Sequence, residues 1–339
     1  MIELPPIERF VASNGARVYR IPCQAFPNLF PRVALVLDAG PPTLIDTGSG
    51  FDQCTTQILD GLRAVRTEFG EPIDVADIKR ILITHGHIDH FGGLGQILEQ
   101  TDARVGIHGL DRRVITAYEE RVVVASKELH AFLQQAGVKP ALQTDLMGIY
   151  TFFKKQRSST QVDFRLEDEQ EFDGFRIIHT PGHCPGQICI GVGNILFSSD
   201  HILPQTTPHQ APESITPFTG VAHYLQSLDK IRKMQGFDLA LGGHEEPMHD
   251  LYARIDDIRQ DHLRKLDQVR AIIKQADTPP TVSDVSKTMY PDVQSFHILL
   301  ALEEAGAHVE YLYQHGELAV ENLDEVESEP NPPLRYRLA

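Results

Sequence analysis

The segment that most constrains the fold of this chain is the run Thr84-His85-Gly86-His87-Ile88-Asp89-His90. It places three imidazoles and one carboxylate within six consecutive positions, and these side chains suit Zn²⁺ and related transition metals. An apolar stretch at 81–83 precedes the run, and a glycine-rich stretch at 91–95 follows it. The pattern predicts a buried strand that ends in a loop of metal ligands, after which a helix begins with its backbone packed close to that loop.

Ligand-type residues also follow four other apolar stretches, each of them beside glycine. The stretch 176–178 leads into a turn that carries His183, and the stretch 194–199 ends on Asp200. The stretch 238–241 leads to His244, and the short stretch 44–45 ends on Asp46. Because a strand end is a rigid place from which to present a ligand, we expect these residues to complete one metal site.

In this order the five segments resemble the motifs of the metallo-β-lactamase superfamily, over roughly the first 250 residues. The resemblance implies an α/β fold, an αββα sandwich with a binuclear metal site along one edge. It also implies ligands for each metal: His85, His87 and His183 for the first, Asp89, His90 and His244 for the second, Asp200 as the bridge between them, and Asp46 as a support behind the ligands. Aspartate at position 200 is typical of the glyoxalase II, lactonase and nuclease branches.

The ligand set indicates hydrolysis. Two divalent metals lower the pKa of a shared water toward neutrality, so that hydroxide attacks a carbonyl or phosphorus atom. Asp89 and Asp200 are the candidate catalytic residues, and Asp200 is the candidate carrier of a proton to the leaving group. Zinc is the preferred metal, with iron and manganese as alternatives for this ligand set. The chain has neither a Gly-x-Ser-x-Gly elbow nor a phosphate-cradling loop that would indicate another mechanism.

Two domains are expected, a catalytic domain at 1–250 and a C-terminal domain at 251–339. A helical insertion at about 111–160, with helices at 114–133 and 142–155, interrupts the catalytic domain. We interpret it either as a roof that selects the substrate or as a packing or dimer contact. Three further residues are candidate substrate contacts, although each is also typical of packing: His201, His209 and Tyr224.

The C-terminal domain is expected to contain a long amphipathic helix, two further helices and two strands joined by an acidic loop. This order resembles the winged helix of β-lactamase-like-2 type hydrolases. From residue 251 onward the chain has 16 acidic and nine basic residues, the opposite of what a duplex-binding wing needs. We therefore interpret the domain as a packing or homodimerisation element that completes the wall of the active site.

Composition favours a cytoplasmic enzyme that acts on a small molecule. The net charge of −16 disfavours nucleic acid as a partner. No apolar stretch approaches the roughly 20 residues of a membrane span, and the N-terminal residues lack the features of a signal peptide. The four cysteines show no paired short spacing, which argues against a disulfide framework.

Three functions remain open at the level of sequence. The preferred hypothesis is hydrolysis of a small acyl substrate, namely a lactone, thioester, ester or amide. The first alternative is a phosphodiesterase or endoribonuclease, which the winged-helix resemblance suggests. The second alternative is an iron-dependent oxygenase-type member of the superfamily, because its motifs overlap with those found here.

Overall fold

The computed structural model describes residues 4–154 and 158–339, and their contacts form two compact units. Unit 1 comprises the described residues up to 117 together with 159–208 and 227–255. Unit 2 comprises the described residues of 118–158 together with 209–226 and 256–339. Most of the expected insertion therefore belongs to the same unit as the C-terminal helices. This division differs from the expected boundary at residue 250, which assigned the insertion to the catalytic domain.

Unit 1 contains a mixed sheet whose strands follow chain order from β1 to β7. β1 to β4 pair antiparallel, whereas β4, β5, β6 and β7 pair parallel. Every residue of β3 and β5 is buried, as expected for near-continuous apolar strands covered on both faces. The strands are β1 (Glu8–Val11), β2 (Arg17–Pro22), β3 (Arg32–Leu37), β4 (Thr43–Ile45), β5 (Arg80–Ile83), β6 (Arg104–His108) and β7 (Phe164–Leu166).

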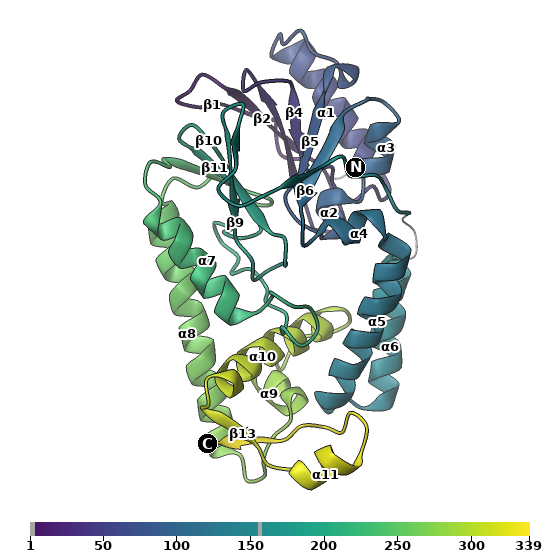
Figure 1. Ribbon diagram of the computed structural model, residues 1–339, viewed down its shortest axis with the longest axis vertical. Coiled ribbons are helices and arrows are strands. Elements are labelled where there is room, and N and C mark those ends of the chain that lie inside the picture. The colour runs from purple at the N-terminus through teal and green to yellow at the C-terminus, as the bar shows by residue number, and fades with distance from the viewer. Residues whose placement is uncertain (1–3, 155–157) are drawn as a thin grey trace. The chain divides into compact units, whose positions relative to one another are not determined.

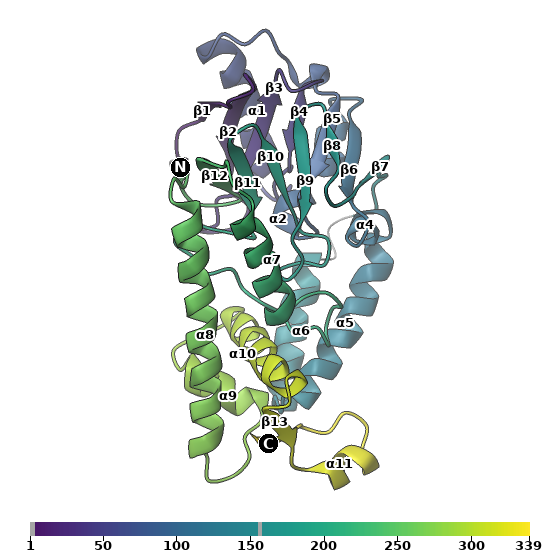
Figure 2. The same cartoon turned by 60° about the vertical axis from the view of Figure 1, so that its left-hand side comes forward.

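A second sheet in unit 1 has the strand order β12-β11-β10-β9-β8. Its pairs are antiparallel except for β11 with β12. The strands of the two sheets lie side by side in both views of the ribbon (Figure 1 and Figure 2). The sheets bury a common core, to which Val36 and Leu82 contribute from the first and Ile190 and Phe197 from the second. The strands are β8 (Glu171–Phe172), β9 (Phe175–His179), β10 (Ile188–Val192), β11 (Ile195–Ser199) and β12 (Leu239–Gly242).

Helices cover both sheets of unit 1. α1 (Cys54–Glu68) packs so closely on β2 that a Cβ atom at Gly61 would lie 2.3 Å from Ile21 Cγ2. α7 (Val221–Lys233), which begins in unit 2, is joined to β9 through Lys230 Nζ, which donates to the His179 carbonyl at 2.9 Å. The expected sandwich is thus confirmed. Three short helices complete this unit: α2 (Ile88–Phe91), α3 (Leu94–Leu98) and α4 (Arg112–Thr116).

Unit 2 is mainly helical and has its own apolar core. β13 and β14 pair antiparallel, as expected, but the acidic segment between them forms helix α11 instead of a plain loop. Whether this region is a winged helix stays a prediction. The elements are α5 (Tyr118–Gln135), α6 (Pro140–Lys154), α8 (Leu251–Gln275, which begins in unit 1), α9 (Val282–Met289), α10 (His297–Gln314), β13 (Leu318–Val320), α11 (Leu323–Ser328) and β14 (Tyr336–Leu338).

A buried polar cluster joins α8 to α10 inside unit 2. Ligand-type atoms of His262, Glu304 and His308 lie within 4.8 Å of one another. Lys265 Nζ donates to Glu304 Oε1 at 2.9 Å, and the two imidazoles lie 3.1 Å apart between His262 Nδ1 and His308 Nε2. Because the ammonium group already supplies the positive charge that Glu304 requires, we interpret the cluster as an ion-pair network rather than a metal site.

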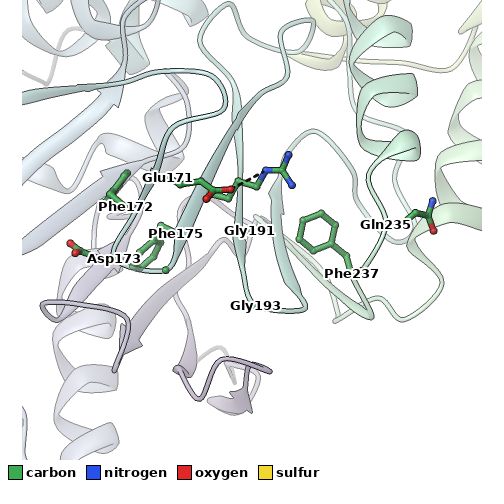
Figure 3. Close-up of a pocket in the computed structure, with 11 residues that line it drawn as sticks. Glu171, Phe172, Asp173, Phe175, Gly191, Gly193, Gln235 and Phe237 are labelled. Atoms are coloured by element: carbon green, nitrogen blue, oxygen red, sulfur yellow. Dashed lines mark ion pairs between the residues drawn. The ribbon is translucent and has the colours of Figure 1, made fainter.

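A surface cavity of about 420 Å³ opens in unit 1 beside the turn between β8 and β9 (Figure 3). Phe172, Phe175 and Phe237 line it together with Gly191 of β10 and Gly193 of the turn between β10 and β11. It shares no residue with the ligand clusters described below. In the part of the chain that the structure describes, no helix combines the length and apolar character needed to cross a bilayer.

Candidate metal centre

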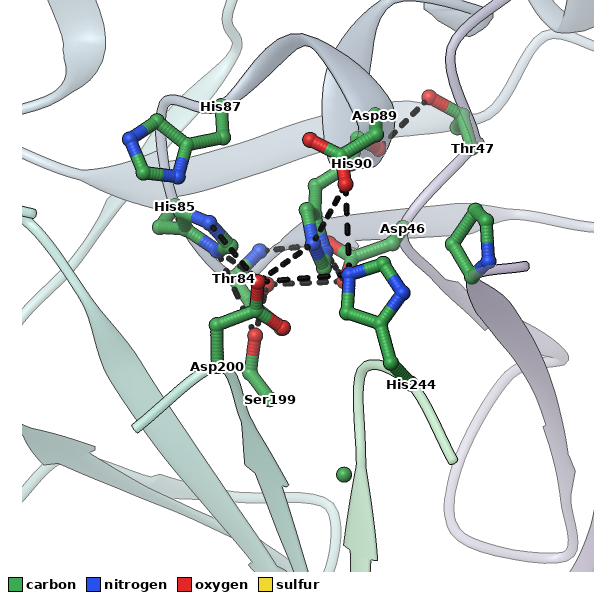
Figure 4. A network of polar contacts seen from close by, with 12 residues as sticks. Asp46, Thr47, Thr84, His85, His87, Asp89, His90, Ser199, Asp200 and His244 are labelled. Carbon is green, nitrogen blue, oxygen red and sulfur yellow. Dashed lines mark hydrogen bonds and ion pairs between the residues drawn. The ribbon is translucent and has the colours of Figure 1, made fainter. Parts of the chain in front are cut away.

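The seven predicted ligands come together in unit 1 as two clusters with one shared member. All of them except His183 are labelled in Figure 4. Within each cluster, one ligand-type atom from every residue lies within 4.8 Å of the others. The grouping is the one that the resemblance implied. The first cluster contains His85, His87, His183 and Asp200, and the second contains Asp89, His90, Asp200 and His244.

Strand ends deliver these side chains. β5 runs directly into Thr84 and His85, and the next residues form the short helix α2 with His87 at its N-cap. Asp200 follows the end of β11, where Ser199 has a φ of +48°, a backbone conformation that few residues other than glycine adopt. His244 lies two residues after β12. The sequence thus positions the cluster on rigid elements of the sandwich.

The Asp200 carboxylate lies at the centre of the site. Its Oδ2 atom is 4.0 Å from His85 Nε2, 3.8 Å from His183 Nε2, and 3.4 Å from both His90 Nε2 and His244 Nε2. One oxygen therefore faces imidazoles of both clusters. Two ligand atoms of one tetrahedral zinc ion lie roughly 3.3 Å apart, so Asp200 Oδ2 is close enough to share a cation with the imidazoles of the second cluster.

Buried atoms without hydrogen bonds indicate that a cation fits this site. Among the described residues, His85 Nε2 and Asp200 Oδ1 are buried and make no hydrogen bond. Leaving such groups unsatisfied costs about 1–3 kcal/mol each, and a bound metal ion would remove this cost. A set of imidazole nitrogens and carboxylate oxygens suits zinc, iron or manganese.

The two clusters differ in their electrostatics. Burial lowers the pKa of His85 and His87 well below the ordinary value, so both rings stay neutral and keep a lone pair for a metal. Burial also opposes a charge on His244, but Asp200 raises its pKa to about 9. Burial opposes ionisation of Asp89, but His90 and His244 lower its pKa to about 2. In the second cluster a metal therefore competes with protons.

Asp46 lies behind the candidate ligand His90 and contacts Thr84 as well. Its carboxylate accepts hydrogen bonds from Thr84 N, Thr84 Oγ1 and His90 Nδ1, each at 2.8 Å. The bond to Nδ1 fixes the ring of His90 with Nε2 directed to Asp200, which is the usual arrangement around a metal-binding histidine. Asp46 thus connects the end of β5 to helix α2.

Several supporting residues were not anticipated from the sequence. Ser199 Oγ donates to Thr84 Oγ1 at 2.8 Å, and Thr84 Oγ1 lies 3.2 Å from His85 Nδ1. Each residue directly precedes a candidate ligand, and this adjacency was the available signal. Asp111 and Arg20 also contact the ligand loops, but neither lies near a motif in the sequence.

The three candidate substrate contacts all take part in packing. His201 is fully buried in unit 1, and burial lowers its pKa to about 3. His209 Nε2 donates to the Leu300 carbonyl at 3.1 Å in unit 2. The ring of Tyr224 packs edge-on against His262, with 5.2 Å between ring centroids. A role of these residues toward substrate stays a prediction.

Comparison with known proteins decides the family. A model of the metallo-beta-lactamase superfamily matches residues 28–272. This chain belongs to the metallo-β-lactamase superfamily. The probable metallo-hydrolase YflN of Bacillus subtilis is 26% identical over 228 residues, which cover 62% of this chain and 79% of that protein. The β-lactamase-like protein 2 homolog of Drosophila melanogaster is 24% identical, over 82% of this chain and 80% of that protein.

Two solved structures share the fold over nearly the whole chain. A metallo-β-lactamase family protein from Thermus thermophilus gives a TM-score of 0.74 at 23% identity, covering 95% of this chain and 98% of its own. A β-lactamase domain protein from Burkholderia ambifaria gives a TM-score of 0.75 at 22% identity, and the match covers 98% of this chain and 94% of that protein. At such identities these likenesses establish the fold and nothing further. The metallo-β-lactamase fold is therefore confirmed.

Proposed function

We propose that this protein is a binuclear metal-dependent hydrolase that acts on a small acyl substrate: a lactone, thioester, ester or amide. The observation that carries the proposal is the pair of ligand clusters joined by Asp200. The probable metallo-hydrolase YflN, to which this chain is similar, supports the general reaction class. Zinc is the proposed metal, with iron or manganese as the alternatives.

The proposed roles of the residues follow from their positions. Two divalent metals in such a site supply a hydroxide nucleophile near neutral pH and polarise the substrate carbonyl. His85, His87 and His183 would hold one metal, and Asp89, His90 and His244 the other. Asp200 would contact both, and its Oδ1 atom, which makes no hydrogen bond, is the candidate to carry a proton to the leaving group. Asp89 Oδ2, 3.3 Å from His244 Nε2, is the second candidate catalytic carboxylate.

The charge of the protein supports an acyl substrate over a nucleic acid. The net charge is −16, and the residues from 251 onward carry 16 acids and nine bases. A phosphate backbone would meet repulsion from such a surface. Acyl hydrolysis is therefore preferred to phosphodiester hydrolysis. An experiment must still separate it from that alternative and from iron-dependent oxygenation.

The experiment compares initial rates of metal-analysed wild type on two matched substrate sets. One set holds lactones, thioesters and a β-lactam, and the other holds an activated phosphodiester and RNA. We expect metal-dependent acyl turnover well above phosphodiester turnover, and its loss in His87→Ala. The control is His249→Ala, which removes an exposed imidazole outside both clusters.

Other results would redirect the assignment. Faster phosphodiester turnover would move the protein to the nuclease branch. Inactivity on both sets with iron bound would favour the oxygenase alternative. Acyl turnover that persists unchanged in His87→Ala would contradict the proposed site itself.

We also propose a cytoplasmic location and a homodimer with no nucleic-acid partner. All four cysteines are free and buried, which is typical of a reducing compartment. Fractionation of cells and light scattering of the purified protein test these two proposals directly.

A further inference from the structure

A buried arginine holds the backbone of the loop that carries His244. Arg20 lies on β2, and its side chain is 1% exposed. Its Nη2 atom donates to three carbonyl oxygens, those of Gly242 at 2.9 Å, His244 at 3.2 Å and Glu245 at 2.8 Å. Glu8 balances the guanidinium charge at 3.0 Å from Nη1. One side chain thus fixes the backbone before, at and after a candidate ligand.

A buried aspartate holds the loops of the other cluster. Asp111 is 1% exposed and occupies the N-cap position of α4, but its carboxylate makes no capping hydrogen bond to that helix. Instead Oδ2 accepts from Gly86 N at 2.7 Å and Oδ1 accepts from Gly186 N at 2.9 Å. Gly86 lies between His85 and His87, and Gly186 lies three residues after His183. One carboxylate therefore ties together the two loops of the first cluster.

Gly186 is needed for this approach, and at Gly86 a side chain would be tightly crowded. A Cβ atom at Gly186 would lie 2.7 Å from Asp111 Cγ, and one at Gly86 would lie 3.2 Å from Asp111 Oδ2. Asparagine is among the favoured N-cap residues, as aspartate is, and would therefore suit the helix. Asp111 uses a different oxygen for each amide, however, so in the same geometry the NH₂ group of asparagine would face one of the two N–H groups donor to donor. The carboxylate of Asp111 therefore serves the hydrogen bonds to the two ligand loops and not the capping of α4.

We propose that Asp111 and Arg20 are positioning residues that set the two metal sites separately. Asp111 positions the site formed by His85, His87 and His183, and Arg20 positions the site to which His244 belongs. The inference rests on the proposed function, because it requires that the centre hold two metals. Residues that orient metal ligands typically contribute 10–100-fold in metal affinity.

The test isolates each site by removing one ligand of the other. His244→Ala leaves the first site, and His183→Ala leaves the second. In each background, Asp111→Asn and Arg20→Lys are added singly, and the Zn²⁺ dissociation constant is measured by competition with a chromophoric chelator. We expect Asp111→Asn to weaken zinc binding about 10-fold or more in the His244→Ala background and to have little effect in the His183→Ala background. Arg20→Lys should weaken zinc binding in the His183→Ala background and have little effect in the His244→Ala background.

Matched controls separate positioning from general loss of packing. Arg80→Lys removes a buried guanidinium that contacts the Ala39 carbonyl instead of a ligand loop. Asp163→Asn removes a carboxylate that accepts from Val105 N, away from both clusters. Thermal melting confirms that each variant folds. If Arg20→Lys does not fold, Glu8→Gln replaces it, because that variant removes the ion pair that helps to hold the Arg20 side chain in place. Glu8 is partly exposed.

The outcomes distinguish the two proposals. Fewer than two zinc ions per wild-type chain would overturn the proposed function, and the inference with it. Two zinc ions in the wild type, together with equal effects of each variant in both backgrounds, would overturn the inference alone. An effect of the control variants as large as that of Asp111→Asn would also overturn it.

Discussion

At the scale of single residues, the candidate ligands depend on side chains that have no direct role as ligands. Asp46 uses both carboxylate oxygens, one for Thr84 N and the other for Thr84 Oγ1 and His90 Nδ1. Its own φ of +63° lies in the left-handed region, which few residues other than glycine adopt. The orientation of His90 is therefore part of a local network, and the network can be tested by removing one acceptor.

Replacement Asp46→Asn should weaken metal binding without unfolding the protein. The amide keeps the shape of the carboxylate, but one oxygen becomes a donor that cannot accept from Thr84 or His90. We expect a loss of about 10–100-fold in zinc affinity at the site that includes His90, measured by chelator competition. Asp238→Asn, at an exposed aspartate that accepts from Asn194 Nδ2, serves as the control. Unchanged affinity in Asp46→Asn would show that the ring of His90 is fixed by other contacts.

The candidate ligands could be predicted from sequence, whereas the residues that position them could not. Three histidines and an aspartate within six positions form a local pattern that little except metal binding explains. Arg20 is one of 31 basic residues and Asp111 one of 47 acidic residues, and nothing adjacent to either distinguishes it. Arg20 reaches Gly242, 222 positions away in the chain. Contacts of this kind depend on the pairing of strands and become visible only in the folded chain.

At the scale of elements, burial decided which parts were predictable. β5 and β11 are buried along their whole length, and their apolar runs were identified correctly. Helix α11 was missed because it is only six residues long and mostly polar, so its two apolar side chains are too few to show a helical periodicity. The helix expected at 114–133 is interrupted at Ala117, where α4 ends and α5 follows. The expected helix at 142–155 is confirmed as α6, although residue 155 lies outside the described residues.

The contact between α8 and α10 should make the protein sensitive to acid. Burial is the main cause that lowers the pKa of His262, to about 3, below the value of about 6.5 in an unfolded chain. The groups that face this ring are Glu304, His308, Lys265, Asp261 and the ring of Tyr224. Because the folded-state pKa is depressed, the unfolded state binds more protons between about pH 6.5 and 3. Stability is therefore present above about pH 6.5 and is lost as the pH falls through this window.

Replacement His262→Gln should reduce this sensitivity. One such group contributes a slope of at most about 1.4 kcal/mol per pH unit. We expect the free energy of unfolding of the variant to fall less steeply than that of wild type between about pH 6 and 4. Urea unfolding in the presence of a chelator measures it without a contribution from metals. His130→Gln, on the exposed face of α5, should keep the wild-type slope. Parallel pH profiles for His262→Gln and wild type would contradict the assignment.

At the scale of the whole molecule, the candidate metal centre lies within one of the two compact units. All seven candidate ligands, with Asp46, Arg20 and Asp111, belong to unit 1. Unit 2 has a separate apolar core and its own buried ion-pair network. The sequence predicted both a catalytic part and a helical part. It could not predict that the insertion and the C-terminal helices share one compact unit, because that depends on contacts between segments far apart in the chain, 118–158 and 256–339.

Removal of metal should therefore destabilise unit 1 selectively. A ligand that binds only the folded state adds about 2.7 kcal/mol of stability at a concentration about 100 times its dissociation constant, so the zinc-loaded protein should unfold at a higher temperature than the chelated protein. Hydrogen exchange compares the two forms segment by segment. We expect faster exchange after chelation in α2 and in the loops that carry His183, Asp200 and His244, because their ligands lose a common partner.

The helices of unit 2 provide the internal reference in the same experiment. α9 and α10 contribute no ligand to either cluster, so their exchange should be the same in the two forms. Asp200→Ala, which removes the shared carboxylate, should make the zinc-treated protein exchange like the chelated one. Equal acceleration in both units would mean that unit 2 depends on the metal centre for its stability. No change in either unit would mean that these residues do not bind metal, and the proposed function would fall with them.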